Sequence, residues 1–158
     1  MALLLLMRLL HILSGIFWVG TMMFNTAFLL PAFKDAGPDG AKVAFGLAKR
    51  KFMLVLPIVA LVTIFSGLWL LWRDSGGFQS SFMSTGMGKA LSFGAACAIV
   101  GFIIGVVVVR PAMMQSMALA QSDPQRAQAL RARSDVAGRI VTALIALAAA
   151  AMAVARYV

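Results

Sequence analysis

The sequence begins with a long apolar run from Leu3 to Pro31, which reads LLLLMRLLHILSGIFWVGTMMFNTAFLLP. A helix over these residues extends roughly 43 Å, which is more than the ~30 Å hydrocarbon core of a bilayer requires. A single segment crossing lipid must satisfy its own backbone hydrogen bonds, and a helix does so. We therefore predict a first membrane-spanning helix over residues 3–31.

The rest of the chain has the same character. Hydrophobic residues make up 62% of the 158 residues and charged residues only 12%, which is far from the balance of a soluble domain and typical of an integral membrane protein. The length suits four spans with short connections and leaves no room for a second, soluble domain. We predict an all-α, four-transmembrane-helix bundle that forms a single domain, with spans over about residues 3–31, 52–72, 90–109 and 137–155.

The formal net charge of +9 reflects fourteen Lys and Arg against five acidic residues. In a soluble protein this excess indicates nucleic acid, but here most of the cations fall in two loops, so we expect anionic lipid headgroups as their partners. The positive-inside rule then predicts cytoplasmic first and third loops and places both termini on the exported, periplasmic side of a bacterial inner membrane. The loop cations are Lys34, Lys42, Lys49, Arg50 and Lys51 in the first loop, and Arg110, Arg126, Arg131, Arg133 and Arg139 in the third.

The single histidine, His11, lies within the first predicted span. Gly15, Trp18 and Met22 follow it at steps of four, three and four, so these residues share one face of a helix. An ionisable side chain within a span is costly in lipid and by default indicates function. We predict that this face points into protein.

The chemistry of the residues near His11 suits a haem. A neutral imidazole can ligate haem iron, while Arg and Lys can pair with the propionates and aromatic rings can pack beside a porphyrin. We predict a b-type haem with His11 as the metal ligand and Arg8, Trp18 and Lys89 as further cofactor-binding residues. A sixth ligand would come from Lys89, Met22, Met87, a second subunit or nothing.

Two other functions remain open. The chain is a cofactor-free structural or assembly subunit if His11 only donates a hydrogen bond to a backbone carbonyl and the GxxxG pair Gly101 and Gly105 docks another membrane subunit or a second copy. A copper or small-solute permease is the third possibility, because the thioethers of Met113, Met114 and Met117 favour copper(I). Motifs of hydrolases and of phosphate-binding loops are absent from the sequence, and whether the protein is an enzyme stays open.

The segment LLHILSGIFWVGTMMFNTAFLLPAF resembles the opening helix of small bacterial four-helix integral membrane proteins of the HemJ/CopD-like group, with Leu-His, then Trp-x-Gly, then a helix-ending Pro. The segment GKALSFGAACAIVGFIIGVVVVRP resembles the third helix of the uncharacterised members, to which the chain is most similar. The resemblance implies that His11 holds the position of the suspected haem ligand in the HemJ family and Lys89 that of the Lys opening its third helix. HemJ proteins carry a further His shortly after the Pro, where this chain has Phe33 and Lys34, so haem binding is implied more strongly than porphyrinogen oxidation.

Overall fold

The computed structural model describes the backbone of all 158 residues and every side chain except that of Pro38. In the part of the chain described, four helices are long and apolar enough to cross a membrane: Ala2–Asp35, Phe52–Asp74, Gly86–Ala118 and Pro124–Tyr157. The predicted fold class, an all-α four-helix membrane bundle, is confirmed. The chain is an integral membrane protein.

The first long helix consists of three segments and leads into a short surface helix and the second long helix. These elements are α1 (Ala2–Phe24), the π-helical turn η1 (Asn25–Leu29), α2 (Leu30–Asp35), α3 (Pro38–Lys49) and α4 (Phe52–Asp74). The second half also begins with a long helix that a π-helical turn interrupts, after the short helix α5. Its elements are α5 (Ser80–Met83), α6 (Gly86–Ile104), the π-helical turn η2 (Gly105–Val109), α7 (Arg110–Ala118), α8 (Pro124–Val154) and the 3₁₀ turn η3 (Ala155–Tyr157).

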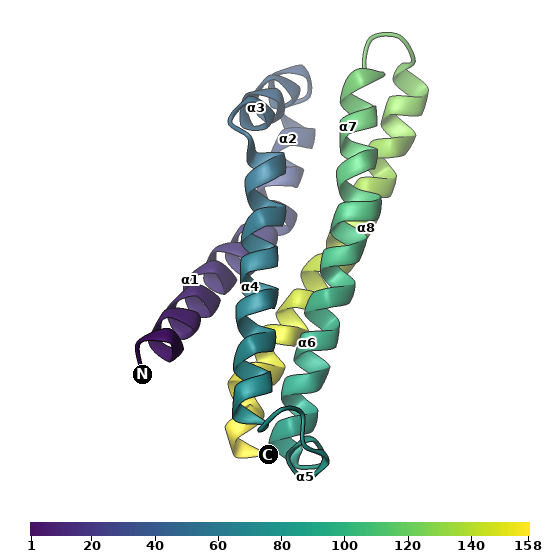
Figure 1. Cartoon of the computed structure of the whole chain (residues 1–158). Coiled ribbons are helices and arrows are strands. Elements are labelled where there is room, and N and C mark those ends of the chain that lie inside the picture. Colours follow the sequence, from purple (N-terminus) through teal and green to yellow (C-terminus); the bar gives the residue numbers. More distant parts are fainter.

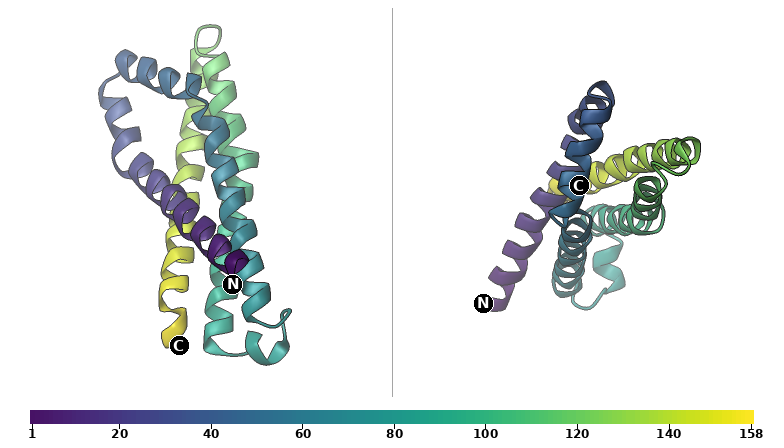
Figure 2. Two further views of the ribbon diagram at one scale, coloured as in Figure 1. Left: turned by 60° about the vertical axis from the view of Figure 1, so that its left-hand side comes forward. Right: turned by 90° about the horizontal axis from the view of Figure 1, so that it is seen from above.

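The four long helices run alternately up and down (Figure 1). The most extensive packing joins α1 to α4 and α6 to α8, so the molecule consists of a first hairpin (residues 2–74) and a second hairpin (residues 86–157). Both termini and α5 lie toward the lower end of Figure 1, while α2, α3 and the α7–α8 turn lie at the upper end. Figure 2 shows that the hairpins point in different directions at this upper end.

Small residues bring α6 and α8 together. A Cβ atom at Gly94 would lie 3.1 Å from the Ala148 carbonyl oxygen, and one at Gly101 would lie 3.3 Å from Cγ2 of Ile145. Close approach of this kind is how membrane helices associate when lipid tails are as apolar as the side chains. Small residues at Gly94 and Gly101 therefore pack α6 against α8 of the same chain.

Ile145 is the most deeply buried large side chain in the described core, at 1% exposure. Truncation by Ile145→Ala should lower the free energy of unfolding by about 2–5 kcal/mol, because it removes packed methyl groups and leaves a cavity. The matched variant is Leu147→Ala on the same helix, where the side chain is 52% exposed and a change within about 0.5 kcal/mol is expected. Both are measured by detergent or denaturant unfolding, and equal losses would contradict this packing.

Two prolines explain the π-helical turns. Pro31 and Pro111 lack an N–H, and their rings exclude the carbonyl four residues earlier from its usual position. In each case the chain widens into a π turn just before the proline, so that the N–H of Leu30 donates to the carbonyl of Asn25 and that of Arg110 to Gly105. The third long helix extends beyond the predicted span of about residues 90–109 and continues past Pro111 to Ala118.

The helices also extend beyond the other predicted spans. The fourth begins at Pro124, well before the predicted residue 137, because the Asp123 side chain caps it by accepting a hydrogen bond from the Arg126 N–H. Outward-facing apolar side chains such as Leu13, Phe65 and Val107 are 64–67% exposed, as expected for surfaces that contact lipid.

Candidate functional site

His11 is held by a single hydrogen bond across the α1–α4 contact. Its Nδ1 lies 2.8 Å from the backbone carbonyl oxygen of Thr63, and His11 itself is half-buried. A carbonyl oxygen only accepts, so Nδ1 of the neutral ring carries the hydrogen and donates it. Nε2 then bears the lone pair of the neutral imidazole, which is the form of histidine that ligates a metal.

Gly67 makes this position of the ring possible. A Cβ atom at Gly67 would lie 2.6 Å from Cε1 of His11 and 2.9 Å from Nδ1, so the imidazole occupies the space that any larger residue would fill. Gly15 lies on the opposite helix, α1, where a Cβ atom would be in ordinary contact, 3.6 Å from Cγ2 of Thr63. Both glycines therefore lie where α1 and α4 make their close contact.

Hydroxyl groups line the same contact between α1 and α4. The Thr63 hydroxyl lies 2.8 Å from the Ser14 hydroxyl and 2.9 Å from the Val59 carbonyl, and the Ser66 hydroxyl lies 3.1 Å from the Thr63 carbonyl. Thr63 and Ser66 are 8% and 3% exposed. Because these groups satisfy one another or nearby helix carbonyls, the contact is polar without carrying a charge.

A cavity of about 670 Å³, here called the His11 cavity, lies beside this contact. Its volume falls within the roughly 300–1,000 Å³ range of small-molecule and cofactor sites. Residues from all four long helices contribute to a mostly apolar lining. The residues that line the cavity include His11, Trp18, Gly67, Asp74, Met87 and Met152.

Asp74 is the charged residue that reaches this cavity from the lower end of α4. Its carboxylate lies 3.3 Å from the Arg73 guanidinium, and both side chains are partly exposed. The pair is thus a surface ion pair at the mouth of the cavity and contributes little to stability. Because Arg73 neutralises Asp74, the pair adds no net charge beside the cavity.

The structure brings some of the predicted site residues together and leaves others apart. His11 and Trp18 line the His11 cavity, as does Met87. Arg8 and Lys89 are exposed near the lower end and do not line it. That all four residues bind a cofactor stays a prediction.

Sequence reasoning missed four residues of this site: Thr63, Ser66, Gly67 and Met152. The first three carried a usable signal, because small and hydroxyl residues at steps of three and four within an apolar span indicate a helix-packing face. Met152 carried none, since a methionine in an alanine-rich helix is not distinguishable from ordinary packing.

The residues behind the two other functions lie elsewhere. Gly101 packs against α8 of its own chain, near Ile145. Met113 and Met117 line a second pocket, whereas Met114 is 51% exposed, so the three sulfur atoms do not share one lining. Among the described residues, no group of three or more His, Cys, Asp or Glu is placed to hold a metal ion.

Comparisons with protein-family models, with curated proteins and with solved structures find no match for this chain. The function of this chain is therefore inferred from the geometry of its site.

Proposed function

We propose that the chain binds a b-type haem in the His11 cavity, where His11 would ligate the iron through Nε2. The observation that carries this proposal is the His11 hydrogen bond: Nδ1 donates to the Thr63 carbonyl beside a large apolar cavity. Histidines that ligate metals commonly donate their other ring N–H to a carbonyl or carboxylate, which fixes the ring and makes the ligating nitrogen more basic. The resemblance of the first helix to the HemJ/CopD-like group supports the same proposal.

The residues present suit a haem in three further respects. The apolar walls exclude water from the macrocycle, and Trp18 offers an aromatic surface at the depth of the core. Thioethers of Met87 and Met152 are available on the lining, and methionine is a known partner of histidine at haem iron. Arg8 and Lys89 lie at the same end of the bundle, where propionates would emerge toward water.

When bound, haem would supply one-electron chemistry, and residues of the chain would hold and orient it. His11 would bind and orient the haem, and the Thr63 carbonyl would hold the Nδ1 proton. The role that we propose is therefore redox or haem-linked, as a multi-pass protein of the bacterial inner membrane that serves alone or as a subunit of a larger complex.

The same hydrogen bond favours a second candidate function. A His11 that donates to a helix carbonyl also satisfies a polar group within a membrane bundle, as expected for a cofactor-free structural or assembly subunit. Only the haem-binding function requires the His11 cavity, because a purely structural histidine needs no open volume beside it.

Haem content decides between these candidates. Protein purified in mild detergent from haem-replete cells is assayed for b-type haem as the pyridine complex and compared with the protein concentration. The proposal predicts stoichiometric haem, whereas a background level in protein that is folded and monodisperse would favour the structural candidate.

We also propose the orientation of the bundle in the membrane. Ten of the fourteen Lys and Arg belong to the upper end, so this end should be cytoplasmic and both termini exported. An alkaline phosphatase fusion after Val158 should be active, and one after Arg50 should be inactive, with the opposite pattern for a fluorescent reporter that folds only in the cytoplasm. The reverse activities would contradict this orientation.

A further inference from the structure

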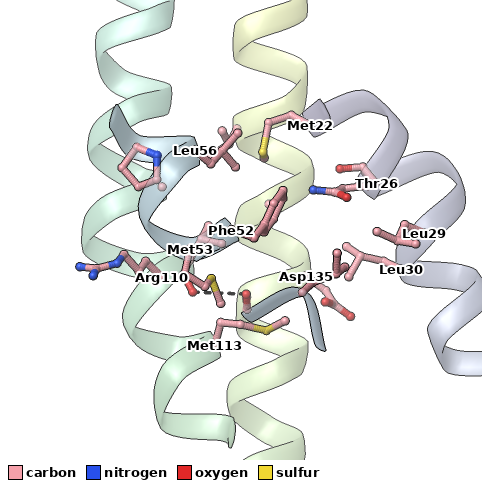
Figure 3. A pocket seen from close by; sticks show the side chains of 18 of the residues that line it. Met22, Thr26, Leu29, Leu30, Phe52, Met53, Leu56, Arg110, Met113 and Asp135 are labelled. Carbon is pink, nitrogen blue, oxygen red and sulfur yellow. Dashed lines mark hydrogen bonds between the residues drawn. The ribbon is translucent and has the colours of Figure 1, made fainter. Parts of the chain in front are cut away.

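A second cavity lies between the two hairpins (Figure 3). It is at the upper end, where the ribbons of the two hairpins diverge (Figure 2). We call it the Arg110 cleft; its volume is about 170 Å³, close to that of engineered apolar cavities of about 150 Å³ that bind benzene. Its deep part is apolar and is formed by Trp18, Met22, Leu56, Phe102 and Val141. It is partly open, so a ligand can enter from outside the bundle.

Charged residues border the upper part of this cleft. Arg110 and Asp135 both line it, and Figure 3 shows the Arg110 guanidinium pointing away from the apolar interior. The Lys34 ammonium group lies 2.7 Å from the Asp135 carboxylate, which joins α2 to α8 across the two hairpins. Lys34 itself is 61% exposed and does not line the cleft.

Arg110 has unused hydrogen-bonding capacity. Its Nε is buried and has no hydrogen-bond partner among the residues that the structure describes. A buried donor without a partner costs free energy, and an arginine fork is well matched to the oxygens of a phosphate. The cleft therefore combines an apolar interior with an arginine at its rim, one of whose donors, the buried Nε, has no partner among the described residues.

We propose that the Arg110 cleft binds an anionic phospholipid, with part of one acyl chain between the hairpins and the phosphate at Arg110. The helix segments at the cleft favour this occupant. Arg110 and Pro111 follow the apolar η2, so the guanidinium lies where a span meets the headgroup region, and the deep residues lie further into the bilayer. The concentration of cations at this end complements a negative headgroup.

Two glycines show where the cleft has room. Gly105 and Gly138 both line it, and a Cβ atom at either would meet nothing within 4 Å. Leucine at either position can therefore fill the acyl-chain space without an immediate clash. This site is separate from the His11 cavity, although Trp18 borders both, and it does not depend on the haem proposal.

Native mass spectrometry of the detergent-purified chain tests the proposal, with phosphatidylglycerol and phosphatidylcholine of identical acyl chains added in turn. We expect the chain to retain phosphatidylglycerol about tenfold more strongly, as charge-assisted hydrogen bonds to the headgroup imply. Arg110→Gln should abolish this preference, whereas the matched variant Arg126→Gln, on the exposed start of α8, should preserve it.

The filling variants test the acyl-chain part of the site. Gly138→Leu and, independently, Gly105→Leu should reduce retention of both lipids in protein that keeps its helix content. Equal retention of the two lipids by the unaltered chain, or the same loss of preference in Arg110→Gln and Arg126→Gln, would overturn the headgroup assignment. Unchanged retention in both leucine variants would overturn the cleft as the site.

Discussion

Protein carrying His11→Ala is expected to lack the Soret band of the unaltered chain while keeping its helix content. The substitution removes the one imidazole in the sequence and leaves a cavity whose other potential iron ligands are thioethers. Loss of outer-shell partners alone typically costs 10–100-fold in metal affinity, so removal of the ligand itself should lower haem retention by at least about a hundredfold.

The matched control for this experiment is Leu13→Ala, two residues along α1, where the side chain is 64% exposed and faces lipid. It should retain haem fully. Circular dichroism and gel filtration of both variants separate loss of haem from loss of fold. A His11→Ala protein that keeps its Soret band would contradict the assignment of His11 as the ligand.

The second large effect is expected at Gly67, a residue that would not itself touch the iron. Gly67→Ala places a Cβ atom where Cε1 and Nδ1 of His11 lie, so the ring must turn and give up its hydrogen bond to the Thr63 carbonyl. The acceptor is the backbone carbonyl of Thr63, so truncating a side chain cannot remove it. Substitution of Gly67 disturbs the hydrogen bond indirectly, by displacing the His11 ring. We expect a 10–100-fold lower haem affinity, the usual cost of losing such a partner.

Gly67→Ala should change the free energy of unfolding much less than it changes the affinity for haem. The atoms displaced belong to the free end of a side chain, so the helices need not separate. Gly20→Ala on α1 is the control, because a Cβ atom there meets nothing within 4 Å. Haem titration of both variants measures the effect, and equal affinities would show that the Thr63 contact does not orient the ligand.

Hydropathy and charge were enough to predict the four spans and the all-α fold, because the bilayer restricts a chain of this composition to few alternatives. The ends of the helices were harder to predict. Residues 110–118 and 124–136 carry too many polar groups to be read as membrane-spanning, yet capping at Asp123 and the π turn before Pro111 allow helix to continue through them.

The site was predictable in part for a similar reason. The spacing around His11 identified an inward-facing helix side, and both His11 and Trp18 line one cavity. The partner of His11 was not predictable, because Thr63 is 52 residues away and the register of α1 on α4 depends on close packing at Gly15 and Gly67. The tilt of α1 across the bundle, visible in Figure 2, likewise cannot be read from periodicity.

The most direct test of the central claim, that His11 holds a haem, is the dithionite-reduced minus oxidised absorption spectrum of the purified, full-length chain from haem-replete cells. If His11 holds a haem, we expect a Soret band that shifts on reduction and sharp α and β bands typical of a b-type haem. A featureless difference spectrum from folded protein, unchanged after incubation with added hemin, would contradict it.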